Sequence, residues 1–277
     1  MQNNFKLGVN HKEIIKNENV KGILLTFYPR NTTDQSVGLN SFSKTSIKIE
    51  LRNSKTKRKI QFFSGYLDGL IEALYAQETL YESVFEQLND RYQVYIPFAA
   101  SGMITPLHLK DDIELVVDIN VDPTTFSTGI SKTTSYVEIE TTVTTNVNHN
   151  RYFPVITEYP IESGKNSATE TLGSDIVKAV FIVDNSFIDY SSSSGTKISN
   201  LNLTGLKKSD LTTYNKNVSE NLLFNQQRLM LAVNPDSTVY NPVIYIGEPL
   251  DNVSVDLQFN QASTPLNKII TVKLENY

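Results

Sequence analysis

The sequence of 277 residues has no cysteine, no tryptophan and only three histidines, His11, His108 and His149. Without cysteine it can form neither a disulfide framework nor a zinc–thiolate site. The histidines lie far apart in the sequence, whereas a cupin-type metal enzyme needs imidazoles and carboxylates clustered on neighbouring strands. A glycine-rich phosphate loop, a serine nucleophile elbow and an H-E-x-x-H helix are also missing. We therefore expect a protein that is not an enzyme and binds no cofactor.

Positive charge and long apolar runs are scarce as well. The formal net charge of -5 disfavours a main role in wrapping nucleic acid, because phosphate binding needs a surplus of Lys and Arg. Residues 1–22 contain no apolar core of signal-peptide length, and no later segment approaches the roughly 20 apolar residues that span a bilayer. We expect a soluble protein, made in a cytoplasm, that reads no specific nucleic-acid sequence.

What the sequence does contain is typical of β-structure. Tyr and Phe are abundant, at 14 and 13 residues. Apolar and polar residues alternate in several segments, as they do in strands that have one face in solvent. The alternation is clearest in 47–52, 113–122, 252–260 and 270–274, and further strands are predicted at 20–28, 91–98, 136–147, 176–183, 228–233 and 243–246.

Two segments have helical rather than strand spacing. Between Tyr66 and Leu88 the apolar residues, Leu70 and Leu74 among them, fall at helical intervals and acidic residues occupy the other faces. This pattern predicts an amphipathic helix that packs on the core. A weaker helical pattern runs through 203–224, where Ser209-Asp210 and Ser219-Glu220 could cap short helices.

The order of these elements is similar in the two halves of the chain. Each half consists of strands, a helical segment and more strands, and a polar joint at 122–131, rich in Pro, Gly and hydroxyl residues, separates them. The similarity is one of element order, because no repeat aligns residue by residue. The sequence therefore predicts an all-β chain with two related parts.

An acidic segment offers one candidate metal site. The acidic run at 111–114 is followed by Asp118, Asn120 and Asp122, so that oxygen ligands of the kind Ca²⁺ prefers recur at every second residue. The segment is not an EF-hand loop, since Pro123 stands where that loop needs glycine. Two interpretations remain open, a structural calcium between subunits and a solvated strand face.

The segment 55–59, Lys-Thr-Lys-Arg-Lys, is the only concentration of positive charge. Its cations Lys55, Lys57, Arg58 and Lys59 could face acidic lipid or nucleic acid, and each basic residue contributes about 1 kcal/mol near an anionic surface. A solvated turn that follows the preceding strand explains the same residues without a ligand.

The element order of the whole chain resembles that of the double jelly-roll major capsid proteins of the adenovirus lineage. The resemblance is closest to small tailless, membrane-containing bacteriophages of the corticovirus and finnlakevirus type. The segment 54–60, Ser-Lys-Thr-Lys-Arg-Lys-Ile, with a strand before it and two strands after the predicted helix, resembles the first jelly roll of the corticovirus protein. In the second half, 174–183, 187–190, 195–197, Tyr214 and the strand from Arg228 resemble its second jelly roll. The long acidic helix at 66–88 departs from that pattern.

The resemblance implies an all-β fold of two jelly-roll β-sandwich domains in tandem, a double jelly roll with short inserted helices. The boundaries expected are an N-terminal arm at 1–19, a first jelly roll at 20–130 and a second at 131–277. The implied function is that of a structural major capsid protein, forming homotrimeric, pseudo-hexameric capsomers of an icosahedral virus with an internal membrane. The implied partners are copies of the chain, neighbouring capsomers, penton or spike proteins and minor capsid proteins, with peripheral contact to the membrane, in a virion capsid assembled in the host cytoplasm.

Residues 1–19 combine Lys6, Lys12 and Lys16 with scattered apolar residues. This mixture can lie at an acidic lipid surface but is too polar to insert. We expect the segment on the inner side of the shell, although a frayed chain end has the same composition. The alternative function is that of a receptor- or carbohydrate-binding β-sandwich module of a phage fibre or spike, for which neither a stalk repeat nor an export signal is visible.

Overall fold

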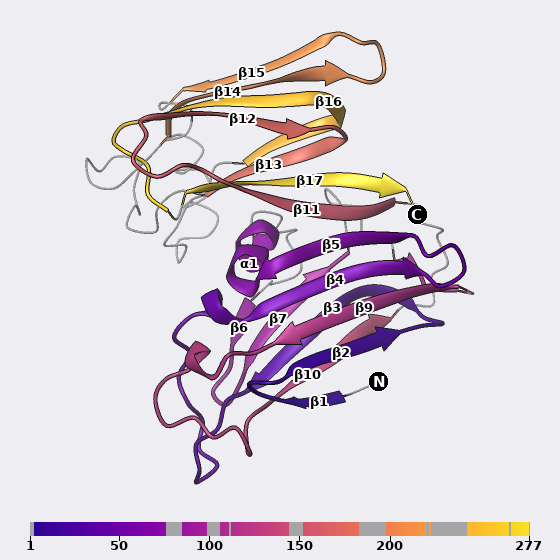
Figure 1. The fold of residues 1–277 in the computed structure, drawn as a ribbon, viewed down its shortest axis with the longest axis vertical. Helices are drawn as coiled ribbons and strands as arrows, with labels where there is room; N and C mark the ends of the chain where they lie inside the picture. Colours follow the sequence, from indigo (N-terminus) through magenta and orange to yellow (C-terminus); the bar gives the residue numbers. More distant parts are fainter. Residues whose placement is uncertain are drawn as a thin grey trace. The chain divides into compact units, whose positions relative to one another are not determined.

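The computed structural model describes residues 3–75, 85–98, 106–110, 112–143, 152–182, 198–219, 222, 243–265 and 267–276 (Figure 1). The chain divides into two compact units. The N-terminal unit comprises Met1–Val155 together with Glu275–Tyr277, and the C-terminal unit comprises Ile156–Leu274. Strands dominate both units, as the abundance of alternating β-branched and aromatic segments predicts.

Two antiparallel sheets form the N-terminal unit. The first has the order β1-β10-β3-β7-β6, with β8 also paired to β3, and the second has the order β2-β9-β4-β5. Phe62 of the second sheet and Phe98, which follows the last residue of β7, meet edge to face with ring centroids 5.3 Å apart, so the buried faces of the two sheets pack together. The strand bounds are β1 Asn3–Lys6, β2 Asn10–Ile15, β3 Asn19–Tyr28, β4 Ser46–Asn53, β5 Lys59–Tyr66, β6 Phe85–Gln87, β7 Tyr92–Pro97, β8 Leu107–His108, β9 Ile113–Asn120 and β10 Tyr136–Val143.

The alternating pattern of β4 and β9 predicts most of their buried apolar residues, although Glu50 and Val116 on the opposite faces are buried as well. Ile47, Ile49 and Leu51 of β4 are buried, and so are Leu115, Val117 and Ile119 of β9. The register pairs Ile49 with Val117 and Leu51 with Leu115, so these side chains share one face of the sheet.

Helical structure is limited. The helix α1, Leu67–Tyr75, buries Leu67, Leu70 and Leu74 in the core, which confirms the predicted apolar stripe at those positions. The predicted continuation to Leu88 is wrong over 85–87, because these residues form strand β6 and pair with β7; residues 76–84 lie outside the described part. Two 3-10 turns, η1 Phe42–Lys44 and η2 Pro123–Thr125, complete the unit.

The described residues of the C-terminal unit form a seven-stranded sheet, with the order β11-β17-β13-β16-β14-β15 and with β12 also paired to β16. The long strand β16 pairs with β13 through its first part, Val243 to Leu250, and with β12 and β14 through its later part. Pro249, which has no amide hydrogen to donate, lies where the partners change. The strand bounds are β11 Tyr152–Pro160, β12 Ser167–Gly173, β13 Ile176–Ile182, β14 Ile198–Lys207, β15 Thr213–Ser219, β16 Val243–Phe259 and β17 Lys268–Asn276.

The predicted helices at 203–224 are wrong over 203–219. These residues belong to the antiparallel hairpin β14–β15, drawn in orange in Figure 1, and Leu203 pairs with Lys216. Asp210, interpreted as a helix cap, instead closes the hairpin turn, since its Oδ1 accepts hydrogen bonds from Thr212 N at 3.0 Å and Thr212 Oγ1 at 2.6 Å. An aspartate can cap a helix or close a hairpin turn, so its presence does not distinguish the two. The long-range pairing of β14 with β16 favours the strand over the helix.

The structure also differs from the predicted domain boundaries. The strand β10 lies beyond the predicted boundary at 130 but pairs with β1 and β3 in the first sheet, and the division between the units falls after Val155. Residues 3–6 and 10–15, assigned to a separate arm at 1–19, are strands β1 and β2 of the N-terminal unit. The polar joint at 122–131 is therefore a connection within this unit, between β9 and β10.

Candidate functional site

The antiparallel register of the N-terminal unit places its connections at two opposite ends. One end, called here the loop end, consists of residues 7–9, 29–45, 88–91 and 121–135. The strand pairing brings these segments together: in the first sheet Tyr136 pairs with both Lys6 and Tyr28, and in the second sheet Asn120 pairs with both Asn10 and Ser46. At the other end, called here the hairpin end, lie the β2–β3 turn and the β4–β5 hairpin, where Ile15 pairs with Leu115 and Asn53 with Ile113. Each end is a candidate surface for function, since binding residues are commonly placed on loops held by a rigid scaffold.

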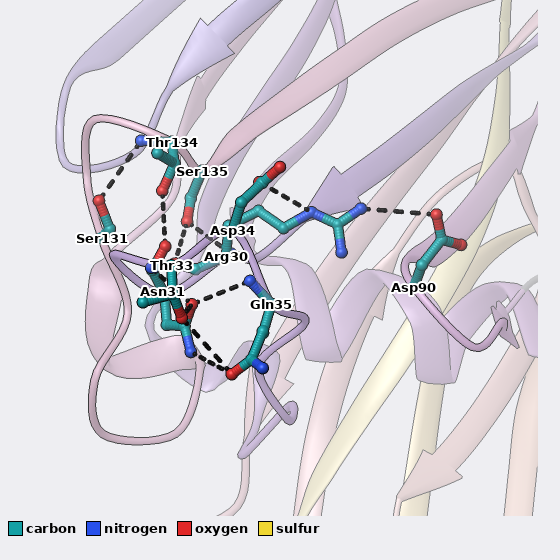
Figure 2. Close-up of polar contacts among 9 residues, drawn as sticks. All are labelled: Arg30, Asn31, Thr33, Asp34, Gln35, Asp90, Ser131, Thr134 and Ser135. Carbon is teal, nitrogen blue, oxygen red and sulfur yellow. Dashed lines mark hydrogen bonds and ion pairs between the residues drawn. The ribbon is translucent and has the colours of Figure 1, made fainter.

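At the loop end, the segments 29–37 and 130–135 are joined by a dense set of polar contacts (Figure 2). Arg30 N donates to Ser135 Oγ at 2.7 Å, and Ser135 Oγ donates back to Arg30 O at 2.9 Å. Thr134 Oγ1 donates to Asn31 O at 3.0 Å. Residues about a hundred positions apart in the sequence thus hold the two segments together.

Asn31 organises the first of these segments. Its Oδ1 accepts hydrogen bonds from Thr33 N at 2.9 Å, Thr33 Oγ1 at 2.8 Å and Gln35 N at 2.9 Å. The Arg30 guanidinium lies 3.5 Å from a carboxylate oxygen of Asp90 and 3.9 Å from one of Asp34. Sequence reasoning missed this network; the Asn-x-Thr and Ser-x-x-Thr spacings are turn signals, but they do not reveal that two distant turns pair.

The candidate calcium residues have other roles in the structure. Asp118 lies on the central strand β9 between Lys12 and Lys48, its register partners on β2 and β4. Asn120 ends the same strand. Asp122 caps η2, its Oδ1 accepting from Thr124 N at 2.7 Å and Thr124 Oγ1 at 2.6 Å, and these hydrogen bonds lower the pKa of its carboxyl group.

Within the described residues, no group of three or more His, Asp or Glu side chains is arranged to hold a metal ion. A calcium that bridges two copies of the chain therefore stays a prediction. The described residues also contain no helix that is both long and apolar enough to span a bilayer.

The basic cluster forms the exposed tip of the β4–β5 hairpin at the hairpin end. Asn53 Oδ1 accepts hydrogen bonds from Lys55 N at 3.0 Å and Thr56 N at 2.8 Å, and Lys57 adopts a positive φ of 63° to complete the turn. The side chains of Lys55, Lys57, Arg58 and Lys59 are exposed. Arg58 lies 3.6 Å from Glu275. The turn predicted from sequence is confirmed, and it presents the cations as a group.

A surface pocket of about 260 Å³ lies at the base of this hairpin. The buried side chains of Leu51 and Ile60 and the half-buried Ile113 line it, together with Arg52, Asn53, Thr56 and Arg58. No sequence signal marks this pocket, because its apolar walls come from three strands that only the sheet brings together.

The turn of the β14–β15 hairpin in the C-terminal unit is firmly anchored. Lys207 N donates to Thr212 O at 2.9 Å and Leu211 N donates to Lys207 O at 3.0 Å. Lys208 forms ion pairs with Asp175 and, at 3.3 Å, with Asp251. Leu211 itself is 77% exposed at the tip.

The described sheets bury the charged side chains of Glu50, Glu138 and Lys178. Burial of Glu50 opposes its ionisation, but hydrogen bonds from Lys48 and Arg52 and the charges of both cations outweigh this effect and lower its pKa. Lys48 Nζ lies 2.8 Å from a Glu50 carboxylate oxygen, and Arg52 contacts the other. On β13, burial lowers the pKa of the Lys178 ammonium group to about 7. Neither Glu50 nor Lys178 lines the pocket at the base of the β4–β5 hairpin.

Comparisons with known proteins find the fold but no sequence relative. No family model matches the chain, and no curated protein does. Among solved structures, the STIV MCP, from Sulfolobus turreted icosahedral virus, has a TM-score of 0.56 at 15% identity, covering 99% of this chain and 94% of that chain. The major capsid protein P2 of bacteriophage PM2 has a TM-score of 0.53 at 7% identity, covering 100% and 98%.

A chain of the PBCV-1 virus capsid has a TM-score of 0.54 at 10% identity, covering 99% of this chain and 92% of that chain. The three matches extend over almost the whole of each protein. The predicted all-β double jelly-roll fold is confirmed. At these identities the likeness concerns the fold alone.

Proposed function

We propose that the protein is a major capsid protein that assembles with copies of itself into an icosahedral shell. The observation that carries the proposal is the match of the whole chain, rather than of one sandwich, to the chains of three viral capsids. A single jelly roll serves many functions, but a tandem pair matched from end to end is a more specific arrangement. The absence of catalytic motifs from the sequence agrees with a structural role.

The finer form of the proposal is a homotrimer. Two sandwiches per chain complete a six-fold-like ring only when three chains combine, and cyclic symmetry closes such a ring. The partners are then neighbouring trimers and the proteins that fill the vertices and joints of the shell. A structural calcium at an interface between copies would add to these contacts.

An internal membrane is the further part of this proposal. The exposed tip cations Lys55, Lys57, Arg58 and Lys59 lie at the hairpin end of the N-terminal unit. Strand β1 also begins on the side of this end. Its first residue, Asn3, pairs with Ile139, and from Ile139 strand β10 continues toward the hairpin end as far as Val143. An acidic lipid surface beneath the shell would attract this end, with about 1 kcal/mol from each basic residue.

Light scattering after size-exclusion chromatography tests the proposal, followed by electron microscopy of the assembled material. We expect a species of three times the chain mass, independent of concentration over the micromolar range, that builds shells. A monomer at every concentration would overturn the proposal. A monomer that also binds glycans on an array would favour the carbohydrate-binding module instead.

A further inference from the structure

The turn of the β14–β15 hairpin carries an unusual residue at its tip. Leu211 has a positive φ of 58° and is 77% exposed. A bulky side chain is rarely found in this left-handed region, where glycine and asparagine are favoured. Folding of the hairpin alone would therefore favour a different residue at this position, and a large apolar side chain exposed on a rigid tip gains free energy only by burial against another surface.

The tip is held in one conformation before any partner binds. Asp210 accepts two hydrogen bonds from Thr212, and Lys208 is held by Asp175 and Asp251. Lys207 lies 3.1 Å from a carboxylate oxygen of Glu248. A pre-organised tip loses little conformational entropy on binding, which is the property expected of an anchor residue at an interface.

The pocket at the base of the β4–β5 hairpin is a matching receptor. Its volume of about 260 Å³ exceeds the roughly 150 Å³ that holds a benzene molecule in an engineered apolar cavity, so it has room for a leucine side chain. Leu51, Ile60 and Ile113 supply the apolar walls. Two cations, Arg52 and Arg58, lie at its rim.

The charges of the two surfaces are complementary. At the Leu211 tip, the carboxylates of Asp175, Asp210, Glu248 and Asp251 outnumber Lys207 and Lys208. We propose that Leu211 of one copy of the chain inserts into the pocket lined by Leu51, Ile60 and Ile113 of a second copy, with the acidic tip facing the basic rim. The contact joins two different patches of the same chain, as a ring of identical subunits requires, and it rests on the proposed function as a self-assembling protein.

An anionic lipid surface is a weaker candidate for this contact. It would attract the lysines of the β4–β5 hairpin but would repel the surplus of carboxylates around Leu211. A second copy of the chain satisfies the apolar tip, the apolar pocket and both sets of charges together.

Cysteine cross-linking tests the contact directly, because the natural chain has no cysteine. Two differently tagged chains, one with Leu211→Cys and one with Thr56→Cys, are co-expressed and oxidised gently. We expect a disulfide between the two tags, since Thr56 lines the pocket and a disulfide requires Cα atoms within about 7 Å. The matched control replaces Thr56→Cys by Val9→Cys, which is also exposed but lies at the loop end, and should give no cross-link with Cys at 211.

Three substitutions complete the test by measuring assembly. Leu211→Asn should raise the dissociation constant between copies about tenfold or more while leaving the melting temperature unchanged or higher, because asparagine tolerates the positive φ. Thr56→Tyr, which fills the pocket from its exposed rim, should weaken assembly similarly. Val9→Asn, at a residue 52% exposed, should leave both quantities unchanged.

The outcomes separate this inference from the proposed function. A trimer that forms normally in Leu211→Asn and Thr56→Tyr, without the cross-link, would overturn the contact and leave the capsid function standing. A wild-type chain that stays monomeric would overturn both. Binding of phosphatidylserine vesicles that Leu211→Asn abolishes, with assembly unchanged, would also overturn the contact in favour of a membrane partner.

Discussion

Arg30 and Ser135, 105 residues apart in the sequence, exchange two hydrogen bonds, one from the Arg30 amide to the serine hydroxyl and one from that hydroxyl back to the Arg30 carbonyl. The hydroxyl is buried, so water cannot replace it easily. This exchange ties the connection after β3 to the connection before β10 and gives the loop end of the N-terminal unit a defined shape.

Ser135→Ala should therefore destabilise the protein. The Arg30 amide would lose its acceptor inside the loop end, while the Arg30 carbonyl would keep the hydrogen bond from Ser131 N at 2.7 Å. We expect a loss of about 1–3 kcal/mol in the free energy of unfolding, measured by urea denaturation. Thr133→Ala removes a hydroxyl that lies 2.9 Å from Ser131 Oγ but is on an exposed residue, where water can replace it, and should cost less than about 0.5 kcal/mol. Equal stability of the two variants would show that the exchange contributes nothing.

Glu50 should contribute stability through its two cationic partners. It is only 2% exposed, yet it lies between Lys48 and Arg52. Glu50→Gln keeps the shape but removes the charge, and we expect a loss of about 1.5–3 kcal/mol at pH 7. Because the pKa of Glu50 is lowered in the folded state, its contribution is present above the ordinary pKa of glutamate and is lost as pH falls through the folded value.

The check on Glu50 is a series of urea midpoints from pH 7 to pH 3 for the wild type and Glu50→Gln. The difference between the two should shrink on acidification. A difference that stays constant over this range would mean that packing, rather than charge, accounts for the effect.

Lys178 should make stability rise with pH on the alkaline side. Burial lowers the pKa of its ammonium group to about 7 in the folded state, against roughly 10.4 in an unfolded chain. Between these values the unfolded state binds more protons, so the free energy of unfolding increases with pH by up to about 1.4 kcal/mol per unit. Below pH 7 both states are protonated and the full cost of the buried charge is present.

Urea midpoints measured at pH 7, 8 and 9 test this expectation. Few other groups titrate in that window, since the chain has no cysteine. Lys178→Met should unfold at a higher urea concentration than the wild type at pH 7 and should lose the rise toward pH 9. If the urea midpoints of the wild type changed with pH as little as those of Lys178→Met, the pKa of Lys178 would not be lowered by burial.

The apolar stripe of α1 should not accept a charge. Leu70 and Leu74 are both buried, and an aspartate in either place would put an unpaired carboxylate in the core at a cost of several kcal/mol. We expect Leu70→Asp and Leu74→Asp to be recovered only as insoluble protein. Tyr66→Asp, at a neighbouring residue that is 57% exposed, should remain soluble with a near-normal melting temperature. If Leu70→Asp and Leu74→Asp also remained soluble with near-normal melting temperatures, α1 would not be part of the core.

Sequence reasoning succeeded where burial follows a local period. The alternation in β4, β9 and β17 and the helical spacing of Leu67, Leu70 and Leu74 are properties of consecutive residues, so the strands and the helix could be predicted in order along the chain. Burial on the second face of a strand, as at Glu50, Val116 and Thr271, could not be predicted in this way. The turn at 53–59 was predictable for the same reason, because a run of polar residues follows an alternating segment. The strand β5 that completes the hairpin was not predicted.

Sequence reasoning failed where a distant strand decides the local conformation. Residues 85–87 have helical spacing in the sequence but pair with β7, and residues 203–207 pair with the later part of β16. The domain boundary was misplaced for a related reason, since the membership of β10 in the first sheet depends on its pairing with β3. Backbone pairing over long separations outweighs a weak local preference.

The sequence by itself therefore determined the all-β class, the lack of cysteine chemistry, the one strong helix and the resemblance in element order to double jelly-roll capsid proteins. Only the tertiary structure decided which residues meet. It placed Asp118 between Lys12 and Lys48, paired Arg30 with Ser135, and assembled Leu51, Ile60 and Ile113 into a pocket. The physical reason is that a pattern along the chain specifies the face on which a side chain lies, whereas its neighbours on that face are set by strand register, which depends on the whole sheet.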